Sequence, residues 1–243
     1  MTAIDYATIT GDGSDDNRTP RSLGTVNDSE IEVRVCGVDG CRGGWVVASA
    51  NGEFVTQDLA YLIPMFDIIG IDMPIGMSAD GRRACDTEAR KALPSRGSTV
   101  FPVPPRSLID IDDYARANQQ SKERFGRGVP RQAFAIWPRI RLLDVLAQRY
   151  PSRFVEVHPE CSFARMAGRV LPTKHGEAGK NIRKKILEKH LGRACVALEG
   201  AKTDDVLDAQ AVLWSTLRFV RGVHETLGDG SVDECGLPMR IVV

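Results

Sequence analysis

Five acidic residues of this chain lie where apolar segments begin or end, and their positions predict a metal site. Asp39 follows one apolar run and Asp72 follows another, while Glu156 lies inside a third. Asp205 and Asp208 lie in the first turns of the last strong helix that the sequence predicts. Burying a carboxylate is costly unless a cation or hydrogen bonds compensate its charge. Carboxylates repeated at the ends of core elements therefore indicate a shared hard cation, Mg²⁺ or Mn²⁺.

The three acids of the predicted strands also have interpretations without a metal. Asp39 precedes a glycine and can form a turn, and Asp72 can cap the turn before Pro74. Glu156 alternates with two valines, so it points to the face of its strand opposite to theirs. On an edge strand that face meets solvent, whereas on a central strand the carboxylate needs a partner.

The acids of the last helix have a capping alternative. Asp205 and Asp208 are three residues apart and can share one side of a helix. Thr203 or Asp204 is a good N-cap, and acidic residues in the first turn suit the helix dipole. Capping explains Asp208 less well, because it lies further along an apolar helix.

Converging carboxylates of this kind suit phosphodiester hydrolysis. Two divalent cations about 3.5–4 Å apart can activate a water and stabilise the leaving oxygen of a phosphodiester. Cationic side chains nearby would hold phosphate groups, with a solvated basic face as the alternative for the lysines. The predicted metal ligands are Asp39, Asp72, Glu156 and Asp205, with Asp208 as a further catalytic acid. The predicted phosphate-binding residues are Arg42, Lys174, Lys180 and Arg183.

Two polar residues that follow Glu156 are predicted to support the metal ligands. His158 and Glu160 flank a proline directly after the predicted strand. His158 would act as a general base or orient a ligand. A histidine that is merely hydrogen-bonded at the end of a strand is the alternative.

Signatures of several other enzyme classes are missing from the sequence. Residues 176–181 resemble part of a P-loop but lack its spacing and its hydroxyl residue. The chain contains neither G-x-S-x-G nor H-E-x-x-H. These absences argue against a P-loop ATPase, a serine hydrolase and a zincin.

Composition indicates an ordinary soluble protein. Of the 243 residues, 42% are apolar and 26% are charged, and the formal net charge is zero. Any contact with nucleic acid must therefore come from local patches. No apolar run reaches the ~20 residues of a membrane helix and the N-terminus lacks an apolar signal core, so we expect a cytoplasmic protein without a membrane partner. The six cysteines lack the spacing of a metal site and are expected to be reduced packing residues.

The predicted elements are those of an α/β protein with a mixed sheet. Residues 1–31 are polar and are predicted to be a disordered tail, and residues 32–243 are predicted to form one domain with a helical insertion at about 76–150. Strands are predicted at 33–39, 45–50, 53–57, 68–72 and 154–157, with a hairpin at Asn51-Gly52 and an edge strand within 236–243. Helices are predicted at 59–65, 82–93, 110–122, 131–150 with a kink or restart at Pro138, 160–167, 177–191 and 204–221. In the second of these helices, helical ion pairs are predicted among Arg82, Arg83, Asp86 and Arg90.

Several motifs in this order resemble those of a known family. They are GVDGCRGGW at 37–45, IDMPIG at 71–76, Arg83-x-x-Asp86-x-x-Ala89-Arg90, Val100-Phe101-Pro102, Glu156-Val157-His158-Pro159-Glu160-x-x-Phe163 and DDVLDA at 204–209. The chain resembles the family catalogued as domain of unknown function 429, whose members are predicted to be ribonuclease H-like nucleases. The resemblance covers about residues 35–240.

The resemblance implies a ribonuclease H-like fold, closest in layout to Holliday-junction resolvases, with helices on both faces of a mixed sheet. It also implies catalytic acids on the first strand, the fourth strand and the final helix, with Glu156 as an additional acid. Leu142 departs from the pattern, because an acidic residue is expected after Arg141. The acids that match the implied positions are Asp39, Asp72, Asp205 and Asp208.

Together these observations predict a Mg²⁺- or Mn²⁺-dependent nuclease or phosphodiesterase that acts on nucleic acid or a nucleotide by two-metal hydrolysis. One alternative is a nucleotide-handling phosphotransferase of the actin-like ATPase lineage. Such enzymes need two domains around the nucleotide, and this chain has room for one. A nucleic-acid- or protein-binding module with a relict site is the other alternative. The identity of the substrate and the oligomeric state stay open.

Overall fold

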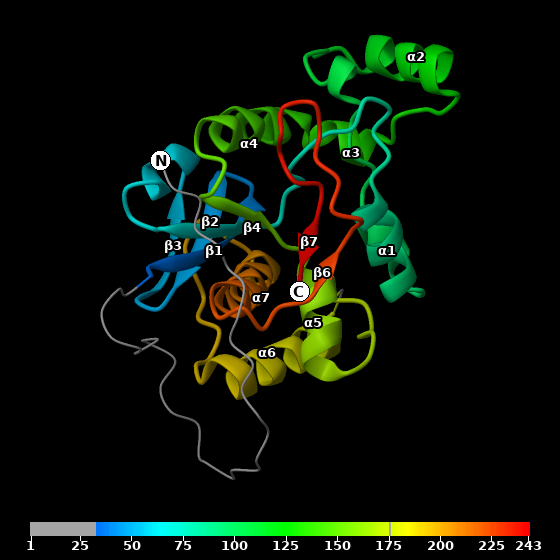
Figure 1. Ribbon diagram of the computed structural model, residues 1–243. Coiled ribbons are helices and arrows are strands. Elements are labelled where there is room, and N and C mark those ends of the chain that lie inside the picture. The colour runs from blue at the N-terminus through cyan, green and yellow to red at the C-terminus, as the bar shows by residue number, and fades with distance from the viewer. Residues whose placement is uncertain (1–32, 175) are drawn as a thin grey trace.

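A five-stranded mixed sheet forms the centre of the protein (Figure 1). The computed structural model describes residues 33–174 and 176–243, and the tail predicted at 1–31 lies outside the described residues. The order of strands across the sheet is β3-β2-β1-β4-β5. Their bounds are Val35–Cys41 (β1), Gly44–Ser49 (β2), Gly52–Thr56 (β3), Ile68–Ile71 (β4) and Phe154–Glu156 (β5).

The sheet combines an antiparallel half with a parallel half. β1 and β3 both pair antiparallel with β2, whereas β1 and β5 both pair parallel with β4. The five predicted strands of this sheet are confirmed, and β3 begins at the glycine of the predicted Asn51-Gly52 hairpin, with a φ of 114°. β1 is shifted two residues toward the C-terminus relative to the predicted strand, because it continues through Asp39 to Cys41, and the turn is confined to Arg42 and Gly43.

Seven α-helices and three short 3₁₀ helices are present among the described residues. The predicted 131–150 helix is divided, and Pro138 lies in the first turn of the second part, where its missing N–H group is tolerated. The α-helices are α1 (Ala84–Ala92), α2 (Tyr114–Phe125), α3 (Arg131–Ala135), α4 (Trp137–Arg149), α5 (Pro159–Ala167), α6 (Glu177–Leu191) and α7 (Thr203–Val220). The 3₁₀ helices are Leu59–Leu62, Gly97–Thr99 and Arg106–Leu108.

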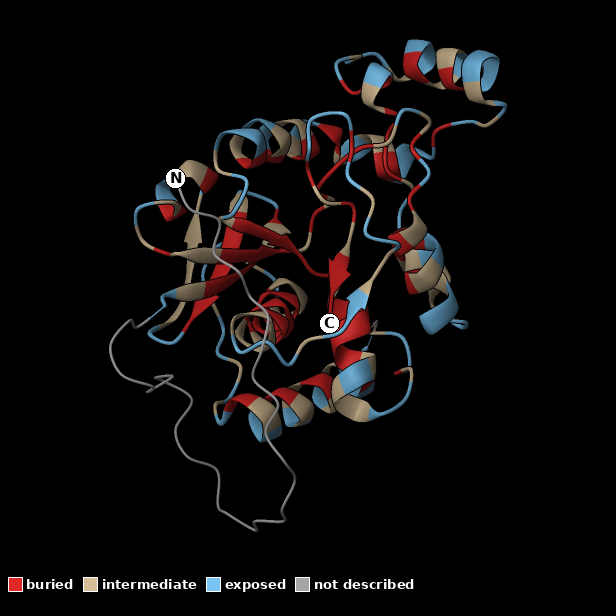
Figure 2. Cartoon of the chain, viewed as in Figure 1, coloured by how far each residue is buried: buried red, intermediate tan, exposed pale blue. Residues whose placement is uncertain are grey.

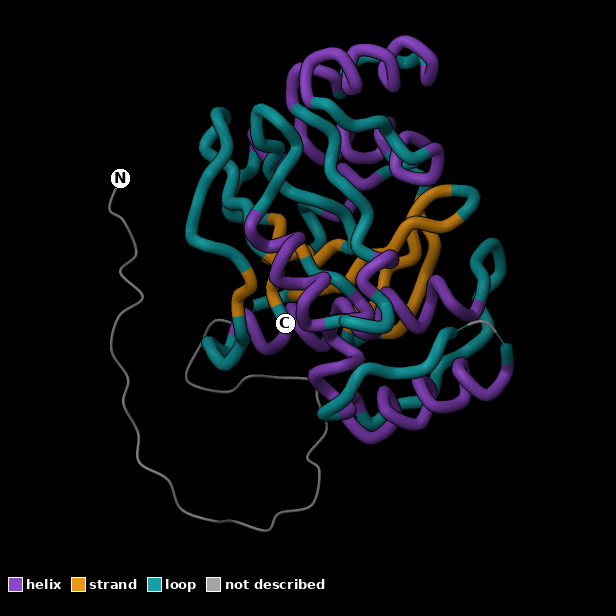
Figure 3. The backbone as a smooth tube through the Cα atoms, turned by 90° about the vertical axis from the view of Figure 1, so that its right-hand side faces the viewer, coloured by secondary structure: helices purple, strands orange, loops and turns teal. Residues whose placement is uncertain are grey.

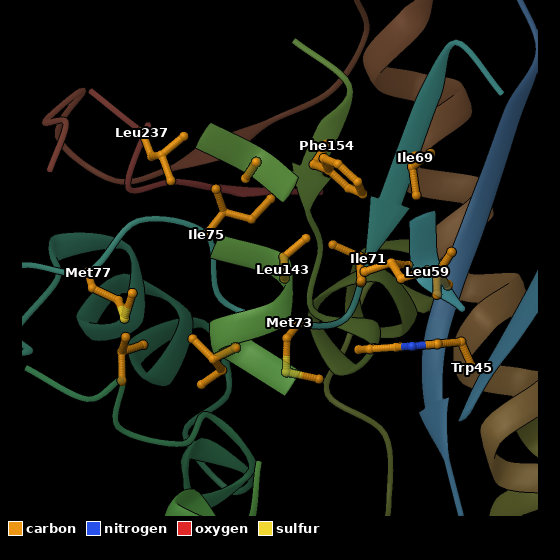
Figure 4. Close-up of a cluster of buried hydrophobic side chains, with 14 of the residues drawn as sticks. Trp45, Leu59, Ile69, Ile71, Met73, Ile75, Met77, Leu143, Phe154 and Leu237 are labelled. Atoms are coloured by element: carbon orange, nitrogen blue, oxygen red, sulfur yellow. The ribbon is translucent and has the colours of Figure 1, made fainter. Parts of the chain in front are cut away.

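Helices cover both faces of the sheet, as predicted. α7 packs against β1, β2 and β4 on one face, and most of its side chains are buried (Figure 2). On the other face, Ile140 and Leu143 of α4 join the same apolar cluster as Ile69 and Ile71 of β4 (Figure 4). Seen from the side, helices lie above and below the strands (Figure 3).

Two glycines let α7 lie directly on the sheet. A Cβ atom at Gly37 would lie less than 3.0 Å from the backbone nitrogen of Leu213, and one at Gly70 would lie less than 3.0 Å from the hydroxyl oxygen of Thr216. Gly37 and Gly70 are partners in the register of β1 and β4. These glycines therefore determine how closely α7 packs against the two central strands.

The Gly37→Ala substitution is expected to lower the free energy of unfolding by about 3 kcal/mol, because the added carbon would overlap helix backbone that cannot rotate away. Gly43→Ala is the matched control, since no atom lies within 4 Å of a Cβ at that position. Its effect should stay within about 0.5 kcal/mol. Denaturant unfolding measures both variants, and equal effects would contradict the close approach of α7.

The segment between β4 and β5, where a helical insertion is predicted, contains α1 to α4. α2 lies farthest from the sheet (Figure 1). Other parts of the insertion come close to the ends of the central strands. Phe101 and Arg139, for example, line the same pocket as the end of β1.

The C-terminal segment differs from the prediction of one edge strand within 236–243. Only Ile241–Val242 (β7) is a strand there, and it pairs with Thr226–Leu227 (β6) in a separate two-stranded sheet. A single bridge from Val242 to Val157 links β7 to the end of β5.

Asp233 explains why the strand is so short. Its buried carboxylate accepts hydrogen bonds from the backbone nitrogens of Cys235 and Leu237, each at 2.9 Å, and bends this segment into a loop. The same carboxylate accepts from the backbone nitrogen of Met77 at 2.9 Å and forms an ion pair with Arg106. The loop is thereby tied to the insertion.

Two further observations bear on the sequence predictions. None of the helices in the described part of the chain is both long and apolar enough to cross a membrane. All six cysteines are free, and four of them are buried, which agrees with a packing role.

Candidate carboxylate site

Asp39, within β1, and Asp72, directly after β4, lie side by side on two central strands. Val38 of β1 pairs with Ile71 of β4, so the two aspartates are the next residues along parallel neighbours. The backbone nitrogen of Asp72 donates to the carbonyl oxygen of Val38 at 2.9 Å and extends this pairing by one bond. Both aspartates line a pocket of about 210 Å³ and retain partial exposure there.

The alternation of side chains directs both carboxylates toward α7. Gly37 and Gly70 face α7, and residues two positions further along a strand share the same face. α7 contributes Asp208, which is only 4% exposed. The Oδ1 atom of Asp208 has no hydrogen-bond partner among the described residues. The structure thus brings together three of the five predicted acids, Asp39, Asp72 and Asp208.

Burial and mutual repulsion make these three carboxylates hard to ionise. Burial is the main cause that raises the pKa of Asp39 well above its usual range, and Asp72 and Asp208 add repulsion. Burial also raises the pKa of Asp72 to about 7 and that of Asp208 to about 6, although the ammonium of Lys174 opposes both shifts. Glu160 adds to the repulsion on Asp72 and Asp208. The ammonium of Lys174 therefore does not fully offset burial and repulsion at these carboxylates.

Lys174 is the cation that lies in this cluster. Its ammonium forms an ion pair with Asp208, and the attraction of Asp208, Asp39 and Asp72 outweighs burial and raises its pKa. The side chain of Lys174 is 29% exposed, so it lies between the carboxylates and solvent. Lys174 was predicted to bind substrate phosphate, whereas in this structure it contacts a predicted catalytic acid.

The donor set suits a hard divalent cation. All three side chains offer oxygen atoms, which Mg²⁺ and Mn²⁺ prefer, and one buried oxygen of Asp208 has no hydrogen bond to any described residue. Within residues 33–174 and 176–243, however, no three His, Cys, Asp or Glu side chains are drawn together tightly enough to form a ready metal cage. The charge near these carboxylates is supplied by the ammonium of Lys174, which Asp208, Asp39 and Asp72 attract.

Glu156, predicted as a fourth ligand, has a different partner. Its neighbours Val155 and Val157 pack in the cluster that contains Val212 of α7, so Glu156 points to the opposite face of the sheet. There its two oxygens bind the guanidinium of Arg83, each at 2.7 Å, and one also accepts from the backbone nitrogen of Ile75 at 2.7 Å. The buried carboxylate does need a partner, as its alternation with valines indicated, and that partner is an arginine.

Asp205 lies at the start of α7 and caps it. Its Oδ2 atom accepts from the backbone nitrogen of Lys202 at 3.0 Å, so it takes the capping role predicted for Thr203 or Asp204. Asp205 still adds to the repulsion that raises the pKa of Asp39. It therefore lies near the cluster with one oxygen engaged elsewhere.

The predicted phosphate-binding residues are dispersed. Arg183 is fully buried, and its guanidinium donates to both oxygens of Glu160, at 2.9 and 2.8 Å, which corrects its predicted role. Lys180 lies 3.8 Å from the carboxylate of Asp204. Arg42 is exposed in the turn between β1 and β2.

The two predicted supporting residues have separate environments. His158 lines the same pocket as Asp39 and Asp72, and its Nε2 atom lies 3.3 Å from the carbonyl oxygen of Thr99. A carbonyl can only accept, so Nε2 carries the proton and Nδ1, which has no partner among the described residues, is an acceptor. Burial lowers the pKa of His158, which favours this neutral form. Glu160 is held by Arg183 and does not face the pocket.

Arg139 is a site residue that the sequence analysis missed. Its guanidinium lies over the ring of Trp45 at 5.3 Å and donates to the carbonyl oxygen of Cys41. Gly40 leaves room for it, because a Cβ there would overlap the guanidinium. Arg139 lines the pocket beside Asp39, so it is a cation close to the carboxylates.

Comparison with known proteins gives one match. A family model described as "Protein of unknown function (DUF429)" matches residues 37–231. No curated protein and no solved structure matches the chain. The matched range contains the whole cluster of Asp39, Asp72, Lys174 and Asp208.

Proposed function

The chain belongs to the DUF429 family of proteins of unknown function, and because that family supplies no activity, we propose one from the site. The protein is a hydrolase of phosphodiesters, a nuclease, that depends on Mg²⁺ or Mn²⁺. The observation that carries this proposal is the convergence of three desolvated carboxylates, one of which has an unpartnered buried oxygen.

The arrangement of the sheet supports a ribonuclease H-like interpretation of the fold. The cluster takes Asp39 from the first strand, Asp72 from the fourth and Asp208 from the final long helix. This is the distribution of acids that the resemblance to ribonuclease H-like nucleases implies. Gly37 and Gly70 explain how a helix residue reaches the strand ends, because they let α7 lie against β1 and β4.

Asp39, Asp72 and Asp208 would hold the cations. Divalent cations at such a cluster supply an activated water and a counter-charge for the leaving oxygen of a phosphodiester. Arg139, beside Asp39, would hold a phosphate oxygen of the substrate. The Nδ1 atom of His158 would accept a hydrogen bond from the substrate in the same pocket.

Calorimetric titration of Mn²⁺ into the wild type and into Asp39→Asn tests this proposal. We expect saturable binding to the wild type and none to the variant, because the substitution replaces one of the three anionic carboxylates at the cluster with a neutral amide. Asp110→Asn, an exposed aspartate of the insertion, is the control and should bind like the wild type.

Assays of Mn²⁺-dependent cleavage on single-stranded, hybrid and branched oligonucleotides would follow for the same three proteins. Cleavage by the wild type that Asp39→Asn lacks supports the proposal. Equal Mn²⁺ affinity in the wild type and Asp39→Asn would overturn it, since the ion would then bind elsewhere.

A further inference from the structure

Lys174 contributes the one cationic group that forms an ion pair within the carboxylate cluster, as far as the described residues go. It lies in the loop between α5 and α6, far in sequence from the strands and the helix that carry the aspartates. Its ammonium contacts Asp208, which is 6% exposed at its side chain, and is also attracted by Asp39 and Asp72. One positive charge thus faces three carboxylates.

A lysine is well suited to leave such a position. Its charge is a compact ammonium at the end of a flexible four-carbon stem, and it does not bind two oxygens in a fixed fork as arginine does. Its side chain is 29% exposed, so the stem has a path to solvent. By contrast, Arg83 and Arg183, which form ion pairs with Glu156 and Glu160, have side chains that are only 1% exposed.

Two contacts hold the backbone of the loop that carries Lys174. The guanidinium of Arg183 donates to the carbonyl oxygen of Pro172 at 3.1 Å. Gly179 of α6 lies so close to the carbonyl of Thr173 that a Cβ would overlap it. The ammonium can therefore leave the carboxylates by rotation of the Lys174 side chain, while the backbone of the loop stays in place.

We propose that Lys174 is a resident counter-ion that a divalent cation displaces from the carboxylate cluster. The inference rests on the proposed function, because it assumes that the cluster binds Mg²⁺ or Mn²⁺. The ammonium keeps the metal-free protein from holding three uncompensated carboxylates. It also weakens metal binding, since the entering cation must replace it and two cations at short range repel each other.

Titration of Mn²⁺ into the wild type, Lys174→Met and Lys180→Met tests this role. Methionine keeps the length of the stem and removes the charge. We expect Lys174→Met to bind Mn²⁺ at least about tenfold more tightly than the wild type, because the competing charge is gone. Lys180→Met is the matched control, since Lys180 lies 3.8 Å from Asp204, outside the cluster, and its affinity should equal that of the wild type.

The outcomes separate the two proposals. Equal Mn²⁺ affinity in the wild type and Lys174→Met would overturn the counter-ion role and leave the metal-dependent function standing. Absence of binding in all three proteins would overturn both. If Mn²⁺ binds to Lys174→Met but to neither of the other two proteins, the counter-ion role is supported, since the ammonium of Lys174 then prevents metal binding altogether.

A second measurement on the wild type does not depend on a folded variant. Brief labelling with acetic anhydride followed by peptide mass spectrometry reports the accessibility of each lysine. We expect Mn²⁺ to increase the labelling of Lys174 severalfold and to leave that of Lys180 unchanged. If Mn²⁺ binds and Lys174 is labelled no faster, the ammonium has not been displaced and the counter-ion role is wrong.

Discussion

The Asp72→Asn variant is expected to lose metal-dependent hydrolysis by about a thousandfold or more, while its metal-free form unfolds at a higher temperature than the wild type. Removal of one ligand forfeits the several kcal/mol of charge stabilisation that a bound cation provides. The gain in stability arises because the same carboxylate destabilises the folded protein when no cation is bound. Burial and the charge of Glu160 raise the pKa of Asp72 to about 7 against the attraction of Lys174, so its ionised form is costly to hold in the fold. An amide carries no such charge.

The gain in stability is expected to depend on pH. The pKa of Asp72 rises from an ordinary 3.8 to about 7 on folding, so between these values the folded wild type binds more protons than the unfolded chain. Its stability therefore falls as the pH rises through this window. Each pKa unit corresponds to about 1.4 kcal/mol, so Asp72→Asn should exceed the wild type by about 2–4 kcal/mol above pH 7 and by little near pH 4. Thermal unfolding in EDTA across this range measures the difference.

Asp110→Asn serves as the control for both effects. Asp110 is exposed and lies outside the pocket, so its substitution should change neither hydrolysis nor the melting temperature. A lower melting temperature for Asp72→Asn than for the wild type at pH 8 in EDTA would contradict the electrostatic description of the cluster. Hydrolysis at the wild-type rate would remove Asp72 from the catalytic machinery.

The Arg83→Met substitution is expected to lower the free energy of unfolding by about 3–5 kcal/mol, because it leaves two buried carboxylates without their cation. Arg83 is 4% exposed and donates to both oxygens of Glu156, each at 2.7 Å. It also donates to Asp86, at 2.5 and 3.3 Å, and to the carbonyl oxygen of Ile75 at 3.0 Å. Urea unfolding with a constant m-value measures the loss.

The neighbouring arginine provides the control. Arg82 has a side chain that is 71% exposed and lies 3.5 Å from an exposed carboxylate of Asp80, so Arg82→Met should cost less than about 1 kcal/mol. The double variant Arg83→Met/Glu156→Gln should be more stable than Arg83→Met, because it removes one of the two buried carboxylates that Arg83→Met leaves unpaired. If the double variant is the less stable of the two, the ion pair is not the source of the loss.

Much of the fold could be predicted because the signals are local. The alternation of apolar residues marks β1 to β5, Asn51-Gly52 marks the hairpin, and Pro138 marks the break before α4. Asp39 and Asp72 could be found for the same reason, because each directly follows the apolar core of a strand. Asp208 could be identified as a candidate site residue because it lies too far along its helix to act as a cap.

The remaining parts of the site depend on contacts between distant segments. The spacing of Arg83 and Asp86 predicts their ion pair, but nothing local shows that Glu156, 73 residues away, joins them. α6 carries basic residues around much of its circumference, and only its packing decides that Arg183 is buried. The position of Lys174 depends on a loop whose path is fixed by α6.

The register of β4 and β5 has a consequence for protein engineering. Ile71 pairs with Glu156, so Asp72, one residue further, and Glu156 emerge on opposite sides of the sheet. At the ends of the strands, however, the Arg83–Glu156 ion pair lines the same pocket as Asp39 and Asp72, so this internal ion pair forms part of the wall of the site. Substitutions that tighten packing on the α4 side can raise thermal tolerance, but they should keep Arg139, Arg83 and Glu156, because these residues line the pocket that also contains Asp39 and Asp72.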